Sequence, residues 1–245
     1  MNTELNLKRL GFFLKRQLYL NISTMWIAIG AILGLLLILS ALFAVFSDDA
    51  EVVFGLRNLY LVVFMVGGYI FTSKIFDEMH APQKSYMFLT LPVSATEKLL
   101  AAWLITSPVY VVVAGLIMLL LTSFSALLAG NTDAFPYLID DVFFNCLGVY
   151  MVTQAVFFLG ATTFRSNNFL KTLLVLIVVV LLIAAYTGGL GYLLFGQAHN
   201  RLEPDSGLKD TAEFIFTRII PMLFWWLLAP FLLVVSYFKL KERQV

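Results

Sequence analysis

Residues 99–132 read LLAAWLITSPVYVVVAGLIMLLLTSFSALLAGNT, without a single Lys, Arg, Asp or Glu. A helix needs roughly 20 apolar residues to cross the hydrocarbon core of a bilayer, which is about 30 Å thick. The whole chain shares this character, because 61% of its 245 residues are hydrophobic and only 13% are charged. Soluble domains carry about 25% charged residues. The sequence therefore predicts an all-α integral membrane protein with a single transmembrane domain over residues 1–245.

Windows without charged residues predict six membrane helices. We expect them at about residues 25–46, 55–73, 99–124, 142–164, 172–195 and 216–238. Between and around them lie an amino-terminal cytoplasmic segment at 1–24, a cytoplasmic loop at 74–98 and an outer loop at 196–215. The second window is short unless Arg57 extends its side chain toward the outer surface. Pro108, Pro221 and Pro230 fall within the third and sixth helices, where they can kink the backbone.

The distribution of basic residues predicts the orientation. Segments on one side of the membrane hold 12 of the 16 basic residues but only 5 of the 15 acidic ones. Cytoplasmic segments carry an excess of Lys and Arg. We therefore expect a multi-pass protein with both termini in the cytoplasm. The short loops favour a bacterial cytoplasmic (inner) membrane.

Composition and spacing argue against several classes of function. A net charge of +1 does not favour nucleic acid binding, which needs a clustered basic field. The lone Cys146 and the distant His80 and His199 do not make a cluster of metal ligands. No acidic or basic side chain lies in the middle of a predicted helix, which weighs against ion-coupled transport and intramembrane proteolysis. We expect no catalytic, cofactor or metal site, although a membrane-embedded enzyme remains an alternative.

The amino-terminal stretch from Leu7 to Leu20 has the spacing of an amphipathic helix. Four leucines follow one face, and four basic residues lie on the polar side: Lys8, Arg9, Lys15 and Arg16. A basic face opposite Leu and Phe is typical of a helix that lies in the membrane interface and contacts lipid. The alternative is a simple basic flank of the first membrane helix.

The loop at 74–98 is the most unusual segment. Ser94 and Glu97 fit a capping box, which predicts that the third membrane helix starts near Ser94. Upstream lies a mixture of charged and aromatic residues, much longer than the connector from Arg165 to Lys171. Exposed Phe and Tyr side chains among charges are typical of a docking element.

The pattern SKIFDE at residues 73–78, followed by YMFLTLPVSATEKLLAAWL at 86–104, resembles the membrane subunits of ABC-2-type ABC transporters. The resemblance implies that the loop forms a coupling helix on a separate cytoplasmic ABC ATPase, which would bind ATP and Mg. It further implies a pairing with a second permease copy or a paralogue. The implied ATPase contacts are Phe76, Asp77, Glu78, Met79, Lys84 and Tyr86. This chain has no G-x-x-x-x-G-K-[ST] phosphate loop of its own.

Uncharged polar side chains are concentrated on the fourth predicted helix: Asn145, Tyr150, Thr153 and Gln154. In hydrocarbon such groups turn inward to find hydrogen-bond partners. They either border a substrate path or only join neighbouring helices. The expected function is the non-catalytic permease subunit of an ATP-driven exporter. The alternative is a non-transporting scaffold or assembly protein that docks a cytoplasmic partner through the 74–98 loop.

Overall fold

The computed structural model describes residues 6–20, 22–46, 50–128, 130, 140–195 and 213–243. Every regular element among these residues is helical, as predicted. The elements in chain order are α1 Leu7–Leu20, α2 Ile22–Phe46, α3 Ala50–Lys74, α4 Asp77–His80, α5 Pro82–Leu89, α6 Ala95–Leu104, η1 Ile105–Val109, α7 Tyr110–Leu128, α8 Asp141–Thr163, α9 Asn168–Phe195, η3 Ile215–Ile219, α11 Ile220–Met222, η4 Leu223–Leu228 and α12 Ala229–Glu242.

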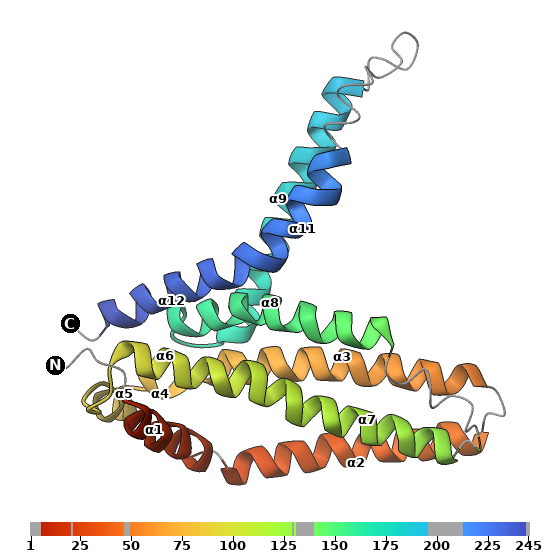
Figure 1. The fold of residues 1–245 in the computed structure, drawn as a ribbon, viewed down its shortest axis with the longest axis horizontal. Helices are drawn as coiled ribbons and strands as arrows, with labels where there is room; N and C mark the ends of the chain where they lie inside the picture. Colours follow the sequence, from red (N-terminus) through yellow and green to blue (C-terminus); the bar gives the residue numbers. More distant parts are fainter. Residues whose placement is uncertain are drawn as a thin grey trace.

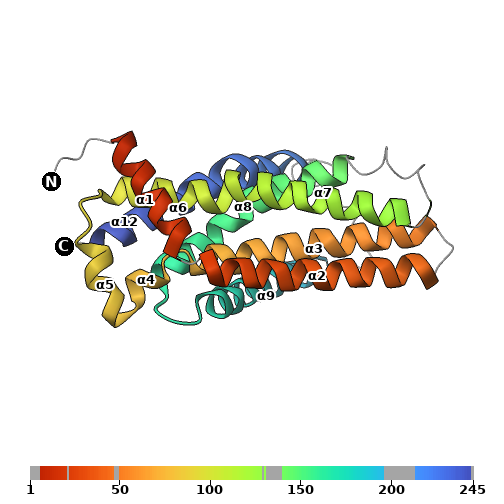
Figure 2. The ribbon, with the colours of Figure 1, turned by 90° about the horizontal axis from the view of Figure 1, so that it is seen from below.

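Helices α2, α3, α7 and α8 lie side by side in an elongated bundle (Figure 1). The short helices α4 and α5 gather at one end of this bundle, together with α1 and the end of α12 (Figure 2). From the same region α9 leaves the bundle, and η3, α11 and η4 return beside it (Figure 1). The chain therefore forms a packed bundle with a two-helix projection.

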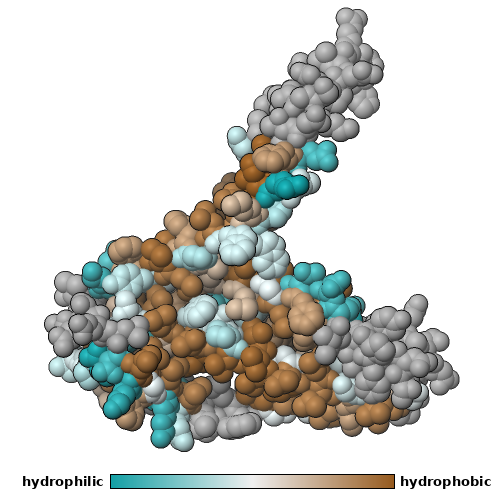
Figure 3. Space-filling view, in the orientation of Figure 1, coloured by the Kyte–Doolittle hydropathy of each residue, from teal (hydrophilic) through white to brown (hydrophobic). Residues whose placement is uncertain are grey.

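Five helices of the described chain are long and apolar enough to cross a membrane: Gly55–His80, Ala95–Leu128, Asp141–Thr163, Asn168–Gly189 and Ile215–Glu242. Within α2, the stretch Ile29–Phe43 is a shorter apolar helix. Hydrophobic surface covers the middle of the bundle, and hydrophilic residues gather at the end that holds α1, α4 and α5 (Figure 3). By length and composition these five helices could span a membrane, which is the pattern expected of a multi-pass membrane protein. The predicted outer loop at 196–215 lies outside the described residues except for 213–215, which are helical.

The predicted capping box is confirmed at the start of α6. The Ser94 hydroxyl accepts a hydrogen bond from the Glu97 amide at 3.2 Å, and the Glu97 carboxylate accepts one from the Ser94 amide at 2.8 Å. These bonds satisfy donors that the first turn of a helix leaves free. The helix therefore begins at Ala95, four residues before the charge-free window, and continues through η1 and α7.

The three prolines lie at irregular helical turns. Pro108 is inside the π-helical turn η1, and the turns η3 and η4 flank the short helix that contains Pro221. Proline lacks an amide hydrogen and clashes with the preceding turn, so a regular α-helix cannot continue through it. The last helix changes direction between α11 and α12, where Pro230 follows η4 (Figure 1). The predicted disturbance of both helices is confirmed.

Gly68 allows a close contact between two helices of the bundle. A Cβ atom added to Gly68 in α3 would lie 2.3 Å from the Tyr150 ring in α8. Real Cβ atoms do not approach a carbon that closely, so this position needs a glycine for steric reasons. The contact brings α3 against the polar face of α8, where the candidate path residues lie.

Candidate functional site

Residues 75–93, here called the elbow, connect α3 to α6 and contain both α4 and α5. Ala81 has an extended backbone (φ −75°, ψ 121°) between the two short helices, and Pro82 opens α5. Proline suits a first helical position because its missing amide hydrogen would have no partner there. The sequence thus folds the predicted loop into two short helices with a sharp turn between them.

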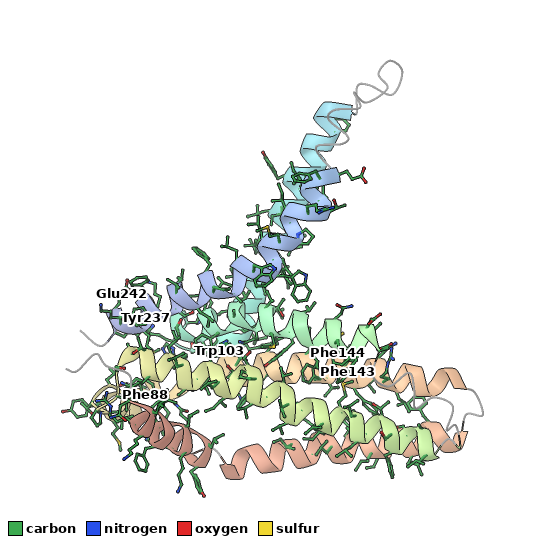
Figure 4. All side chains as sticks on the ribbon, viewed as in Figure 1. Phe88, Trp103, Phe143, Phe144, Tyr237 and Glu242 are labelled. Atoms are coloured by element: carbon green, nitrogen blue, oxygen red, sulfur yellow. The ribbon has the colours of Figure 1, made fainter. Side chains whose placement is uncertain are left out.

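One side of the elbow, its root, is buried in the protein core. Phe76 and Phe88 are fully buried, and Met79 is 4% exposed. The Phe76 ring packs edge-on against Phe158 of α8, with 5.3 Å between the ring centroids. The Phe88 ring packs against Phe13 of α1, with 6.0 Å between the centroids. Phe88 lies at the corner between α5 and α1 (Figure 4). These apolar contacts join the elbow to two helices that are distant in the sequence.

Ion pairs join α1 to the elbow and to α6. The Arg16 guanidinium donates to the Glu78 carboxylate at 2.9 Å. Arg9 donates to Glu97 at 3.0 Å, and the Asn6 amide donates to the same carboxylate oxygen at 2.8 Å. Glu97 is fully buried, so these donors are needed to offset the loss of its hydration. Two of the four residues predicted to form a basic face therefore point toward the protein.

Lys98 of α6 binds the carboxyl-terminal end of α5. Its side chain is fully buried, and its ammonium group donates to the Phe88 carbonyl at 2.9 Å. The same ammonium lies 4.9 Å from the centre of the Phe88 ring. A carbonyl dipole and an aromatic face are both favourable neighbours for a cation that has left water.

His80 links α4 to the ends of α8 and α12. Its Nε2 lies 2.7 Å from the Ala161 carbonyl, and its Nδ1 lies 2.6 Å from a nitrogen of Arg243. A guanidinium only donates hydrogen bonds, so Nδ1 must accept, and the ring proton then sits on Nε2. Arg243 also donates to the Thr163 carbonyl at 3.2 Å. This neutral histidine therefore connects three helix ends at one point.

The opposite side of the elbow, its tip, is open. Tyr86 and Met87 are 76% and 63% exposed, and Pro82, Gln83 and Lys84 are exposed beside them. Two large apolar side chains on a polar rim match the composition of protein–protein interfaces, which favour Tyr and Met. The tip is the part of the elbow that a partner can reach.

The structure divides the six implied ATPase contacts between these two sides. Lys84 and Tyr86 lie on the tip. Asp77 is exposed but accepts a 3.4 Å hydrogen bond from Asn168 at the start of α9, and Glu78 is held by Arg16. The expectation of an exposed Phe76 is wrong, and Met79 is buried with it, because both side chains pack inward at the end of α3. Met87, which the sequence interpretation missed, is exposed one position after Tyr86.

The candidate path residues on α8 also separate. Asn145 is exposed, whereas Tyr150 and Gln154 are fully buried. The Tyr150 hydroxyl donates to the Thr106 carbonyl of η1 at 2.8 Å, and Thr153 shares a 2.6 Å hydrogen bond with Tyr69 of α3. The predicted inward orientation is confirmed for Tyr150 and Gln154. The Gln154 amide, however, has no hydrogen-bond partner in the described chain at either its oxygen or its nitrogen.

An ion pair joins the far ends of α3 and α8. Arg57 donates to the Asp140 carboxylate at 2.9 Å, and Asp140 also accepts the Phe143 amide at 3.0 Å as the N-cap of α8. Partial burial alone would raise the pKa of Asp140. These hydrogen bonds and the nearby guanidinium outweigh that effect and hold the pKa below its ordinary value. An aspartate just before an apolar run is a helix-start signal, so the cap was detectable in the sequence. The pairing of this aspartate with Arg57 could not be predicted from the sequence.

Among the residues that the structure describes, no three His, Cys, Asp or Glu side chains are grouped to hold a metal ion. Comparison with protein-family models, curated proteins and solved structures finds no match for the chain. The resemblance carried by residues 73–104 thus rests on those residues alone. The elbow, with its buried root and open tip, is the candidate functional site.

Proposed function

We propose that the protein is the membrane-spanning subunit of an ATP-driven exporter of the ABC-2 type, and that the tip of its elbow docks a separate cytoplasmic ATPase. The observation that carries the proposal is the division of the elbow. Its tip exposes Tyr86 and Met87, while its root is tied to other helices by Phe76, Phe88 and His80. An element of this kind suits the transfer of movement from a partner into a bundle.

In the proposed topology the chain crosses the membrane six times. The spans are α2, α3, the continuous helix from α6 to α7, α8, α9, and the helix from η3 to α12. This places the elbow, α1 and the end of α12 in the cytoplasm, on the side that holds 12 of the 16 basic residues. A bacterial cytoplasmic membrane fits this arrangement. Arg57 and Asp140 then pair at the outer surface.

The contacts of the root define which helices would respond to the ATPase. Phe76 and His80 contact α8. Phe88 and Glu78 contact α1. His80 also contacts Arg243 at the end of α12. The ATPase would bind ATP and Mg, and this chain would bind neither. A second copy of the chain or a paralogue would complete the translocation path, since six helices are few to enclose one.

Within that path we place the polar face of α8. Gln154 is buried, neither of its polar atoms has a hydrogen-bond partner among the described residues, and Tyr150 lies one turn away. A buried amide without partners is costly, so it is retained where a polar ligand or water meets it. We propose that Gln154 contacts the exported substrate.

Co-purification tests the docking step. The protein is co-expressed with candidate cytoplasmic phosphate-loop ATPases, and the complex that forms is isolated in detergent. The variant Tyr86→Ala/Met87→Ala removes the apolar part of the tip, and the control Leu116→Ala/Leu120→Ala removes two large exposed side chains from α7. We expect the tip variant to lose both the ATPase and ATP-dependent export from vesicles, and the α7 variant to keep both.

Two results would contradict the proposal in different ways. A tip variant that melts like the unmodified protein and still binds the ATPase would show that docking occurs elsewhere. A complex that forms through the tip but exports nothing on addition of ATP would favour the scaffold alternative.

A further inference from the structure

Helix α1 has two faces of different composition. Leu10, Phe13 and Gln17 are buried on the side that packs against the protein. The outward side carries Lys8, Phe12, Lys15 and Tyr19, which are spaced four, three and four residues apart and therefore share one helical face. Phe12 and Tyr19 are 74% and 64% exposed. We call these four residues the outer stripe of α1.

The outer stripe differs from the basic face expected from the sequence. Arg9 and Arg16 form ion pairs with Glu97 and Glu78, and Leu7 and Leu18 are exposed. Lys8 and Lys15 stay exposed, and neither ammonium group has an acidic partner among the described residues. The result is a face on which free cations alternate with aromatic rings.

The stripe includes a shallow depression. Phe12, Lys15, Arg16 and Tyr19 line a volume of about 410 Å³, with the Lys15 ammonium 5.7 Å from the centre of the Tyr19 ring. Two cations thus border a hollow whose remaining walls are aromatic. This combination suits a ligand that is anionic at one end and apolar at the other.

We infer that the outer stripe binds the headgroup of an anionic phospholipid in the adjoining membrane leaflet. The lysine ammonium groups would donate to the lipid phosphate, and the Phe12 and Tyr19 rings would lie along the glycerol and upper acyl chain. Exposed aromatic rings next to Lys are typical of helices at the membrane interface. A soluble phosphate would use the cations but would leave both rings in water, so the aromatic half of the stripe favours a lipid.

The site touches the elbow through Arg16. One nitrogen of its guanidinium bonds to Glu78 of α4, while the side chain also lines the depression. A bound headgroup would therefore lie beside the ion pair that holds α4. The inference does not depend on an ATPase partner, because the stripe is present whatever the elbow docks.

Lipid retention by the full-length protein tests the inference. The protein is exchanged into micelles that contain equal amounts of phosphatidylglycerol and phosphatidylcholine, and the lipids that remain bound are measured by native mass spectrometry. A Lys beside an anionic membrane surface contributes about fivefold in affinity. We expect preferential retention of phosphatidylglycerol and a loss of about 25-fold in that preference for Lys8→Gln/Lys15→Gln. The control Lys171→Gln/Lys241→Gln removes the same charge from exposed sites on α9 and α12 and should change it less than twofold.

Further measurements distinguish the binding of a lipid from the binding of a soluble anion. Phe12→Ala/Tyr19→Ala should reduce retention of both lipids, and millimolar inorganic phosphate should displace neither. For the unmodified protein, raising salt from 0.1 M to 1 M should abolish the preference, because the screening length falls from about 10 Å to about 3 Å. Equal retention of the two lipids, an equal loss in the control variant, or displacement by phosphate would each overturn the inference.

Discussion

Helix α3, which leads into the elbow, and the helices of the α9–α11 projection are all apolar enough to cross a membrane, but they pack very differently. In the most apolar part of α3, 44% of the residues are buried, whereas in α9 and in the helix from η3 to α12 the share is 6%. At the elbow, aromatic rings, ion pairs and His80 join α1, α4, α5, α8 and α12. The described part of the projection has few such contacts. Hydropathy alone therefore does not distinguish helices that pack within the protein from helices that face lipid or another subunit.

The difference has a physical origin in side-chain size and polarity. In α3 and α8, Gly68 and Tyr150 fit against each other, and Tyr69 shares a hydrogen bond with Thr153 across the interface. In the projection, large aliphatic side chains point outward along most of α9. Within hydrocarbon, helices associate through close packing and hydrogen bonds rather than through the hydrophobic effect. A helix without either stays in contact with lipid unless a partner supplies them.

The largest expected effect comes from the root of the elbow. Phe76→Ala removes a fully buried ring and its contact with Phe158, and we expect it to lower the free energy of unfolding by about 3–5 kcal/mol. Phe216→Ala in η3, on the projection, removes a ring that is 66% exposed and should change the free energy of unfolding by less than about 0.5 kcal/mol. Equilibrium unfolding in detergent, followed by circular dichroism, measures both. Equal losses would erase the contrast between the two regions.

A glycine pair sharpens the same contrast. Gly68→Ala places a methyl group 2.3 Å from the Tyr150 ring, and such overpacking should cost about 2–3 kcal/mol. At Gly188 in α9 an added Cβ meets nothing within 4 Å, so Gly188→Ala should be neutral or slightly stabilising through its better helix propensity. Thermal unfolding of the two variants in one detergent is the comparison. A neutral Gly68→Ala would mean that α3 and α8 do not approach as closely as described.

The buried carboxylate should matter more than the exposed one. Glu97→Ala removes the capping box and leaves Arg9 without this acceptor, for an expected loss of about 2 kcal/mol. Glu242→Ala in α12 breaks only the exposed pair with Lys239, which is worth about 0.5 kcal/mol or less. Urea titration of both variants can resolve this difference. Similar losses would indicate that Arg9 and Asn6 do not hold Glu97 in solution.

The smallest stability effect carries the sharpest functional readout. Gln154→Leu replaces a buried amide that has no hydrogen-bond partner among the described residues, so we expect a gain of about 1 kcal/mol in stability. Export should fall at the same time if the amide contacts the substrate. Vesicle transport assays and thermal unfolding are measured on the same preparation. Unchanged export in the stabilised variant would remove Gln154 from the path.

Much of the fold followed from local sequence. The helices followed from the length of apolar runs, and the start of α6 followed from the spacing of Ser94 and Glu97. The direction of the side chains at the elbow could not be predicted from local sequence, because the partners of Arg9 and Arg16 lie 88 and 62 residues away in the chain. A local pattern places Phe76 on a helix end but does not say what packs against it. The exposed tip, rather than the whole loop, emerged only from tertiary contacts.

The sidedness of the elbow is the claim on which the proposed function most directly depends. With Cys146 replaced by Ser, single cysteines are introduced as Gln83→Cys on the tip and Asp141→Cys at the other end of the bundle, both at exposed positions. A membrane-impermeant maleimide is then added to intact cells and to inside-out vesicles. We expect Gln83→Cys to react only in the vesicles and Asp141→Cys to react only in the cells. Labelling of Gln83→Cys in intact cells would place the elbow away from ATP and contradict the proposal.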